Sequence, residues 1–108
     1  MKLSEKKCVP CTGEVPALAP EQIARLNSQL AGWQVIDNKR IIKSFALKDF
    51  KAAMQLADKI AVIADEEGHH PDLTVRFGSL QVELWTHKIN ALTESDFILA
   101  DKIDEAAK

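Results

Sequence analysis

Apolar residues recur with two different spacings along the chain, and the spacing predicts where helices and strands alternate. Between residues 20 and 30 the apolar side chains lie three or four positions apart, which is typical of one face of a helix. Pro20 can begin this helix because the first helical position needs no N–H donor, and Gly32 follows its end. Residues 49–67 and 93–108 repeat the helical spacing. The sequence therefore predicts three helices.

Four shorter segments have the pattern of strands, and they come in two pairs. Residues 33–36 and 40–46 flank an Asp-Asn-Lys segment that favours a turn. Residues 73–77 and 80–84 are apolar at every second position and flank a Gly-Ser dipeptide at 78–79. Glycine at the first position of a two-residue loop is typical of a type II′ hairpin. The sequence therefore predicts two hairpins.

The order helix-strand-strand-helix-strand-strand-helix predicts an α+β fold. A four-stranded antiparallel sheet with three helices packed on one face buries the apolar side of every element. Residues 1–19 contain Pro10, Pro16 and both cysteines, so we expect an irregular N-terminal arm there. Residues 20–108 are expected to form a single domain.

The helix predicted over residues 49–67 carries more apolar residues than one face needs. Leu56 and Ile63 lie off its main stripe, so the helix is apolar over most of its circumference. The second surface is either deep core or a subunit contact, and we favour the contact, in a homodimer or homotetramer. The stripe that we expect to be buried consists of Phe50, Ala53, Met54, Ala57, Ile60, Ala61 and Ala64.

Charge and hydropathy exclude two classes of protein. The formal net charge is −2, with acidic and basic residues interleaved, so the chain lacks the basic surface of a nucleic-acid-binding protein. No apolar run approaches the roughly 20 residues that span a bilayer, so no membrane segment is expected. The first residues do not resemble a signal peptide, and a cytoplasmic location is expected.

All three histidines of the chain are predicted to lie at one end of the second hairpin. His69 and His70 are adjacent and precede its first strand, and His87 follows its second strand. A loop at residues 78–79 places His70 opposite His87, and directly opposed side chains have Cβ atoms about 4.5–5.5 Å apart. Both histidines then lie on the polar face of the sheet, together with Trp85. A cluster of imidazoles is suited to proton transfer near neutral pH.

Two carboxylates are candidates to support this cluster, and each has a structural alternative. Asp65 lies one helical turn before His69 and can reach back to it, or it is simply solvated. Asp96 lies in the first turn of the last helix, where it also completes a capping box with Thr93. The pattern alone favours the capping role for Asp96.

A metal site is the main chemical alternative to proton transfer. Three histidines can hold zinc, but adjacent histidines on an extended backbone point to opposite sides, which makes joint ligation awkward. Cys8 and Cys11 form a CxxC motif far from the histidines in the sequence. A redox motif of this kind is expected at a strand-to-helix turn, not in a proline-containing arm. The pattern therefore does not favour a metal site, and the role of the cysteines stays open.

The stretch from Asp65 to Asp96 resembles the pterin-4a-carbinolamine dehydratase family. An acid is followed after three residues by His69-His70-Pro71, and the stretch then contains an aromatic residue at 77, a Thr-His pair at 86–87 and a Thr-Glu-x-Asp segment at 93–96. The predicted layout also agrees, and nearly the whole chain is covered. Two positions depart from the pattern: Asp65 stands where Glu is common, and Leu73 where many relatives carry an aromatic residue.

The resemblance implies dehydration of 4a-hydroxytetrahydropterin to quinonoid dihydropterin and water, without a metal or organic cofactor. This reaction recycles the pterin cofactor of aromatic amino-acid hydroxylases. It implies that His69 and His87 donate protons to the leaving hydroxyl, and that His70 chiefly positions the pterin. Asp96 would orient a histidine or accept a proton, and Asp65 would support His69.

Other readings of the same residues stay open. Trp85 could stack on the flat pterin substrate or belong to the core or an interface. Some relatives of the resembled family act as dimerisation or assembly factors, so a non-catalytic binding module of the same fold is an alternative function. A histidine-based metal site is another. The complete set of three histidines favours the dehydratase.

Overall fold

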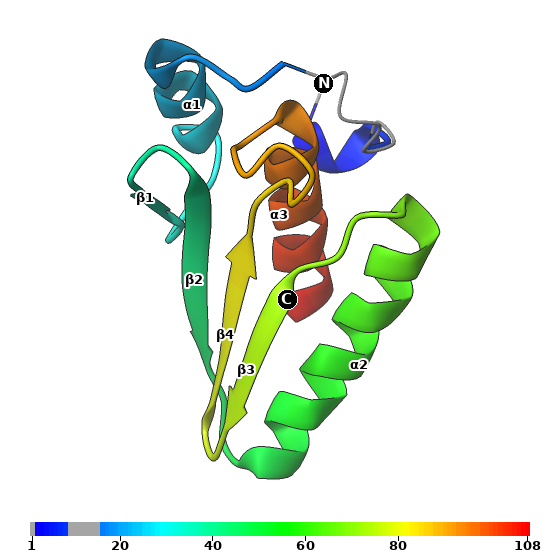
Figure 1. Cartoon of the computed structure of the whole chain (residues 1–108). Coiled ribbons are helices and arrows are strands. Elements are labelled where there is room, and N and C mark those ends of the chain that lie inside the picture. Colours follow the sequence, from blue (N-terminus) through cyan, green and yellow to red (C-terminus); the bar gives the residue numbers. More distant parts are fainter. Residues whose placement is uncertain (1, 9–15) are drawn as a thin grey trace.

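Three α-helices and a four-stranded sheet make up the chain, in the order that the sequence predicts (Figure 1). The structure is a computed structural model, and it describes residues 2–8 and 16–108. This arrangement confirms the α+β class. The elements are η1 (Leu3–Glu5), α1 (Pro20–Asn27), β1 (Gln34–Ile36), β2 (Arg40–Ala46), α2 (Phe50–Glu67), β3 (Asp72–Arg76), β4 (Ser79–Leu84) and α3 (Glu94–Ala107).

The sheet has the strand order β1-β2-β4-β3, and all neighbouring strands are antiparallel. Helices α2 and α3 pack against one face of it, and α1 lies beside α3 (Figure 1). Alternate side chains of β4 point toward these helices, so Leu80, Val82 and Leu84 are fully buried. They join Ile60 of α2 and Phe97 of α3 in one hydrophobic core. None of the described helices is long and apolar enough to cross a membrane.

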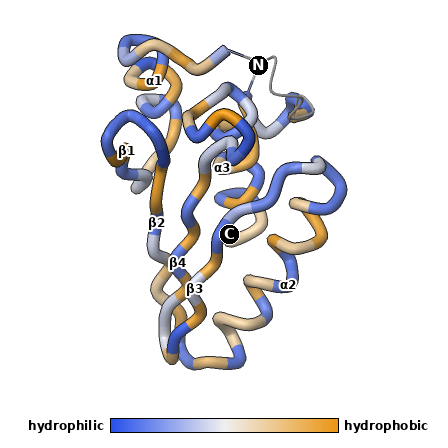
Figure 2. The backbone as a smooth tube through the Cα atoms, viewed as in Figure 1, coloured by the Kyte–Doolittle hydropathy of each residue, from blue (hydrophilic) through white to orange (hydrophobic). Residues whose placement is uncertain are grey.

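Helix α2 buries a stripe that overlaps the predicted one in Ala53, Ala57, Ile60 and Ala64 but differs from it in the other residues. Its buried residues are Ala53, Leu56, Ala57, Ile60 and Ala64. The expected burial of Phe50 and Met54 is wrong, because these side chains are 50% and 41% exposed, and Ala61 is exposed as well. Apolar residues surround much of the helix (Figure 2), so two overlapping stripes fit the helical spacing equally well.

The loop of the second hairpin is displaced from the predicted position by one residue. Val75 pairs with Leu80, and Leu73 pairs with Val82, so the two loop residues are Phe77 and Gly78, not Gly78 and Ser79. Gly78 has a φ of +79°, which glycine adopts without strain. Each strand pairing therefore shifts by two residues, and a shift of two leaves every side chain on its predicted face. Both registers pair apolar residues with apolar residues, so the pattern could not distinguish them.

Both ends of α2 agree with the helix predicted over residues 49–67. Asp49 caps the helix by accepting a hydrogen bond from the N–H of Ala52 at 2.8 Å. Gly68 ends it in the left-handed conformation, with a φ of 66°. This turn directs the chain from α2 toward β3, and it brings His69 to Asp96 in the first turn of α3.

Candidate active site

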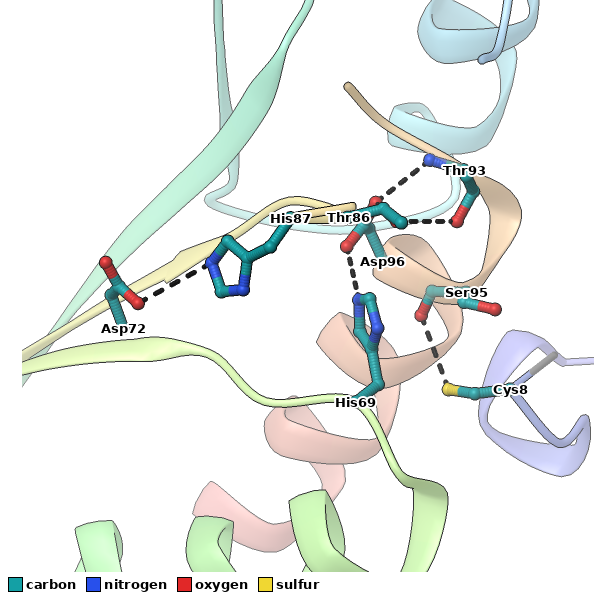
Figure 3. Close-up of polar contacts among 8 residues, drawn as sticks. All are labelled: Cys8, His69, Asp72, Thr86, His87, Thr93, Ser95 and Asp96. Atoms are coloured by element: carbon teal, nitrogen blue, oxygen red, sulfur yellow. Dashed lines mark hydrogen bonds and ion pairs between the residues drawn. The ribbon is translucent and has the colours of Figure 1, made fainter. Parts of the chain in front are cut away.

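His69 and Asp96 form a buried pair between the end of α2 and the first turn of α3. Nε2 of His69 lies 2.5 Å from Oδ1 of Asp96 (Figure 3). The side chain of His69 is 4% exposed and that of Asp96 is completely buried. The N-terminal end of a helix favours a negative charge, so the position of Asp96 suits the ionised carboxylate. With an ionised acceptor, Nε2 of His69 is the nitrogen that carries the proton in this bond.

The second oxygen of Asp96 is held by two donors. Oδ2 accepts hydrogen bonds from the backbone N–H of Thr93 and from the hydroxyl of Thr86, each at 2.9 Å. The two threonine hydroxyls are also 2.9 Å apart. The expected capping contact of Asp96 is therefore present, and the same carboxylate also binds a histidine. The sequence pattern presented these two roles as alternatives, whereas the structure contains both.

His87 lies at the open side of the site. Its side chain is 50% exposed, and Nε2 is 3.8 Å from Oδ1 of Asp72 (Figure 3). Its ring also meets the ring of Trp85 edge-on, with centroids 4.3 Å apart. Trp85 lines a neighbouring cavity of about 200 Å³ together with Arg40 and Asn90. The tryptophan therefore supports the ring of His87 from one side.

His70 is paired with a different carboxylate from the one that supports His69. Its Nε2 lies 3.0 Å from Oδ1 of Asp65, and both side chains are exposed. We expected Asp65 to reach back to His69, and this expectation is corrected, because the left-handed turn at Gly68 carries His69 inward toward α3. His70 follows it on the outer side, within reach of Asp65.

The three histidines converge on one surface cavity, as the sequence predicts. Gly68, His69, His70, His87 and Lys88 line a cavity of about 220 Å³. His70 and His87 are not paired in the ladder, since β3 begins only at Asp72. The histidines still lie close together because the shift of the hairpin register leaves the side chains of both strands on their predicted faces. The buried imidazole of His69 and the exposed imidazoles of His70 and His87 therefore surround a single cavity.

Sequence reasoning did not assign a role to several residues of the site. Thr86 is buried and hydrogen-bonded to Asp96. Thr86 follows the buried Leu84 by two positions, so the alternation of the second hairpin places both side chains on the same face. This alternation is the signal that could have indicated the burial of Thr86. Asp72 and Lys88 are exposed polar residues near the histidines, and no spacing rule separates them from ordinary surface residues.

The described residues offer no ready metal site. Within residues 2–8 and 16–108, no group of three or more His, Cys, Asp or Glu side chains is arranged to hold a metal ion. Burial, together with the neighbouring Glu67 carboxylate, raises the pKa of the Cys8 thiol to about 12. Cys8 is therefore protonated at neutral pH, which does not favour a reactive thiolate. Cys11, the second residue of the CxxC motif, lies outside the described residues.

Sequence comparison places the chain among proteins of one family. Residues 16–106 match the family model described as Pterin 4 alpha carbinolamine dehydratase. A Rickettsia bellii protein that is provisionally named as such a dehydratase is 50% identical over 103 residues, which cover 94% of this chain and 91% of the relative. A protein from Rubrobacter xylanophilus with the same provisional name is 43% identical, with 95% and 96% covered.

Two solved structures share the fold. The crystal structure of a transcriptional coactivator/pterin dehydratase from Brucella melitensis matches with a TM-score of 0.81 and 31% identity, and covers 86% of this chain and all of its own. A pterin dehydratase-like RuBisCO assembly factor of the alpha-carboxysome matches with a TM-score of 0.60 over 70% of this chain and 89% of its own. Its identity to this chain is only 19%, so this second match concerns the fold alone.

Proposed function

Because the chain belongs to the pterin 4 alpha carbinolamine dehydratase family, we propose that it dehydrates 4a-hydroxytetrahydropterin to quinonoid dihydropterin and water. In the cell this reaction recycles the pterin cofactor of aromatic amino-acid hydroxylases. The observation that carries the proposal is the convergence of His69, His70 and His87 on one open cavity. A flat pterin can enter from the solvent side, since two of these imidazoles are exposed.

The reaction breaks the C4a–O bond and removes a proton from a ring nitrogen. The leaving hydroxyl takes up one proton to become water, so a proton donor at oxygen and an acceptor at nitrogen are both required, each worth about 10²–10⁴-fold when positioned. His69 and His87 are the proposed donors to the hydroxyl. Only one of them gives the proton in a given turnover, and the imidazole that has given it accepts the proton lost from nitrogen, so its protonated state is restored and no net proton is consumed.

The remaining site residues have positioning roles in this proposal. Asp96 is completely buried and bonded to His69, Thr86 and Thr93, so it acts through His69 and not on the substrate. His70, with Asp65 beside it, positions the pterin ring at the rim of the cavity. Trp85 holds the ring of His87 and offers an aromatic surface next to the cavity.

The direct test is to measure the decay of a chemically made 4a-hydroxytetrahydropterin with and without the protein. We expect the protein to accelerate dehydration well above the spontaneous rate, and to do so equally after treatment with a chelator. A rate equal to the spontaneous one would contradict the proposal. Elemental analysis of protein purified without added metal addresses the metal alternative: a stoichiometric transition metal would support a metal-dependent function instead.

A second candidate function is a non-catalytic assembly module. The fold similarity to the alpha-carboxysome assembly factor is the observation that supports this second function. The complete histidine cluster favours the enzyme, because a scaffold has no need of a buried His69–Asp96 pair opening onto a cavity. Isolation of a stable macromolecular partner, together with an absence of turnover, would favour the assembly role.

We also propose that the chain self-associates as a homodimer or homotetramer through α2. Leu56, which first suggested a contact, is 6% exposed and belongs to the core. The exposed apolar side chains of α2 are instead Phe50, Met54 and Val62. Burying this surface against a second copy would remove it from water, which is favourable in proportion to the apolar area buried.

A further inference from the structure

Glu67, the last residue of α2, joins three segments that are far apart in the sequence. Its Oε1 accepts a hydrogen bond from the backbone N–H of Cys8 at 2.9 Å. Its Oε2 lies 3.3 Å from the Nζ of Lys102 on α3. The side chains of Glu67 and Lys102 are only 10% and 20% exposed. One carboxylate therefore connects the end of α2, the N-terminal segment and α3.

The position of His69 depends on where α2 ends. Only Gly68 separates Glu67 from His69, and a Cβ atom added to Gly68 would meet no atom within 4 Å. The left-handed conformation of Gly68 directs the chain out of the helix, but no neighbouring atom packs against the side of Gly68 on which a side chain would lie. His69 must nevertheless place its Nε2 within hydrogen-bond distance of Asp96, which lies on α3. The bond between Glu67 and Lys102 holds the end of α2 against that same helix.

The N-terminal segment supports this bond from the other side. Residues 2–8 lie along α3, where the Leu3 side chain is 3% exposed and the backbone N–H of Ser4 donates to Asp101 at 2.8 Å. The Sγ of Cys8 lies 3.5 Å from the backbone oxygen of Ser95, the residue before Asp96 (Figure 3). The segment is thus attached to α3 at both ends, and the N–H of Cys8 is held in place to bind Glu67.

The charge of Glu67 is part of the arrangement. The hydrogen bond from Cys8 lowers the pKa of this carboxyl, against the opposing effect of its burial, and Lys102 lowers it further. The group is therefore ionised at neutral pH. Hydrogen bonds to an ionised acceptor are roughly twice as strong as those between neutral groups.

We propose that Glu67 is a positioning residue for the active site: bound to Lys102 and to the Cys8 backbone, it holds the imidazole of His69 on Asp96. The consequence for turnover rests on the proposed dehydratase function. The consequence for the geometry of His69 does not, since it concerns the protein without substrate. The N-terminal segment thereby becomes part of the active-site support, although none of its described residues lines the histidine cavity.

The test compares Glu67→Gln with Glu66→Gln, a matched change at the exposed neighbouring acid. In ¹⁵N-edited NMR spectra, the ring signals of His69 report its tautomer and its hydrogen bond to Asp96. We expect these signals to shift or broaden in Glu67→Gln and to stay unchanged in Glu66→Gln. We also expect kcat of Glu67→Gln to fall about tenfold with little change in KM, since a displacement of 1 Å costs on the order of 10²-fold.

Lys102→Met breaks the same bond from its other side and serves as the second variant if Glu67→Gln does not fold. Each single variant should lower kcat similarly, and the double variant should lower it no further, because both remove one interaction. Unchanged His69 signals in a folded Glu67→Gln or Lys102→Met protein would overturn the proposal, whatever the activity. A wild-type protein without turnover would instead contradict the dehydratase function. The NMR spectra would still test whether Glu67 positions His69.

Discussion

Asp96 binds His69 with one carboxylate oxygen, at 2.5 Å, while its other oxygen accepts hydrogen bonds from Thr93 and Thr86. The same group therefore caps α3, joins the segment after β4 to α3 and fixes a histidine that lines the cavity. A completely buried carboxylate of this kind contributes to stability as well as to the orientation of His69. The two contributions can be separated by the choice of substitution.

Asp96→Ala should destabilise the fold strongly. It removes the acceptor of the ring N–H of His69 and of the backbone N–H of Thr93 in a buried site, at about 1–3 kcal/mol for each unsatisfied group. We expect a total loss of about 3 kcal/mol or more in the free energy of unfolding, measured with urea. Asp58→Ala, at an exposed position on α2, is the control and should cost less than about 0.5 kcal/mol.

Asp96→Asn should lower turnover more than stability. The amide keeps the shape of the side chain and one acceptor oxygen, but it removes the charge that holds the N–H of His69. We expect kcat to fall by about 10²-fold, within the range for a misplaced acid, while the free energy of unfolding falls less than in Asp96→Ala. Equal activity of Asp96→Asn and the wild type would contradict the role of Asp96 in orienting His69.

Glu67 should make stability depend on pH in the acidic range. Its pKa is lower in the folded protein than the ordinary value of 4.5. Its contribution to stability is therefore present above about pH 4.5 and lost as the pH falls through the folded pKa. We expect the stability of Glu67→Gln to depend less on pH below about 4.5 than that of the wild type, in urea unfolding at a series of pH values. Glu66→Gln should retain the wild-type dependence.

Cys8 should react slowly with alkylating reagents. Its pKa is raised from 9.0 to about 12 in the folded protein, so the thiolate fraction at pH about 8 falls by roughly 10³-fold. In a Cys11→Ser variant, where Cys8 is the remaining cysteine, we expect labelling with iodoacetamide to be far slower than in the same protein unfolded in urea. Equal rates in the two states would show that Cys8 is accessible and ionisable.

The exposed surface of α2 should determine the oligomeric state. Met54→Glu places a charge within the apolar surface that also includes Phe50, and we expect it to lower the molar mass measured by light scattering. Gln29→Glu introduces the same charge at an exposed position outside α2 and should leave the mass unchanged. A wild-type protein that is monomeric at high concentration would contradict self-association through α2.

The sequence predicted the order of elements and the convergence of the three histidines because both depend on short-range patterns. The left-handed turn at Gly68 and the alternation in the second hairpin are local, and they bring the histidines to one end of the sheet. The strand register and the buried stripe of α2 were not predictable in this way. Two registers of equal parity pair apolar residues equally well, and the packing of α3 against the sheet decides which side of α2 is buried.

The contact between His69 and Asp96 depends on tertiary structure in the same way. The two residues are 27 positions apart, and their contact requires α2, β4 and α3 to be assembled. Spacing along the chain made Asp65 the expected partner of His69, whereas the turn at Gly68 sends His69 to α3 and leaves His70 beside Asp65. The end of the helix at residue 67 was predicted, but the direction in which the turn sends the following side chain was not.

The most direct test of the central claim is the rate of 4a-hydroxytetrahydropterin dehydration by His69→Ala, His87→Ala and the double variant. Circular dichroism and urea unfolding would confirm that each variant is folded. We expect each single substitution to lower kcat by about 10²-fold or more, and the double variant to approach the spontaneous rate. If both folded single variants kept the full wild-type rate, proton transfer by these histidines would be contradicted.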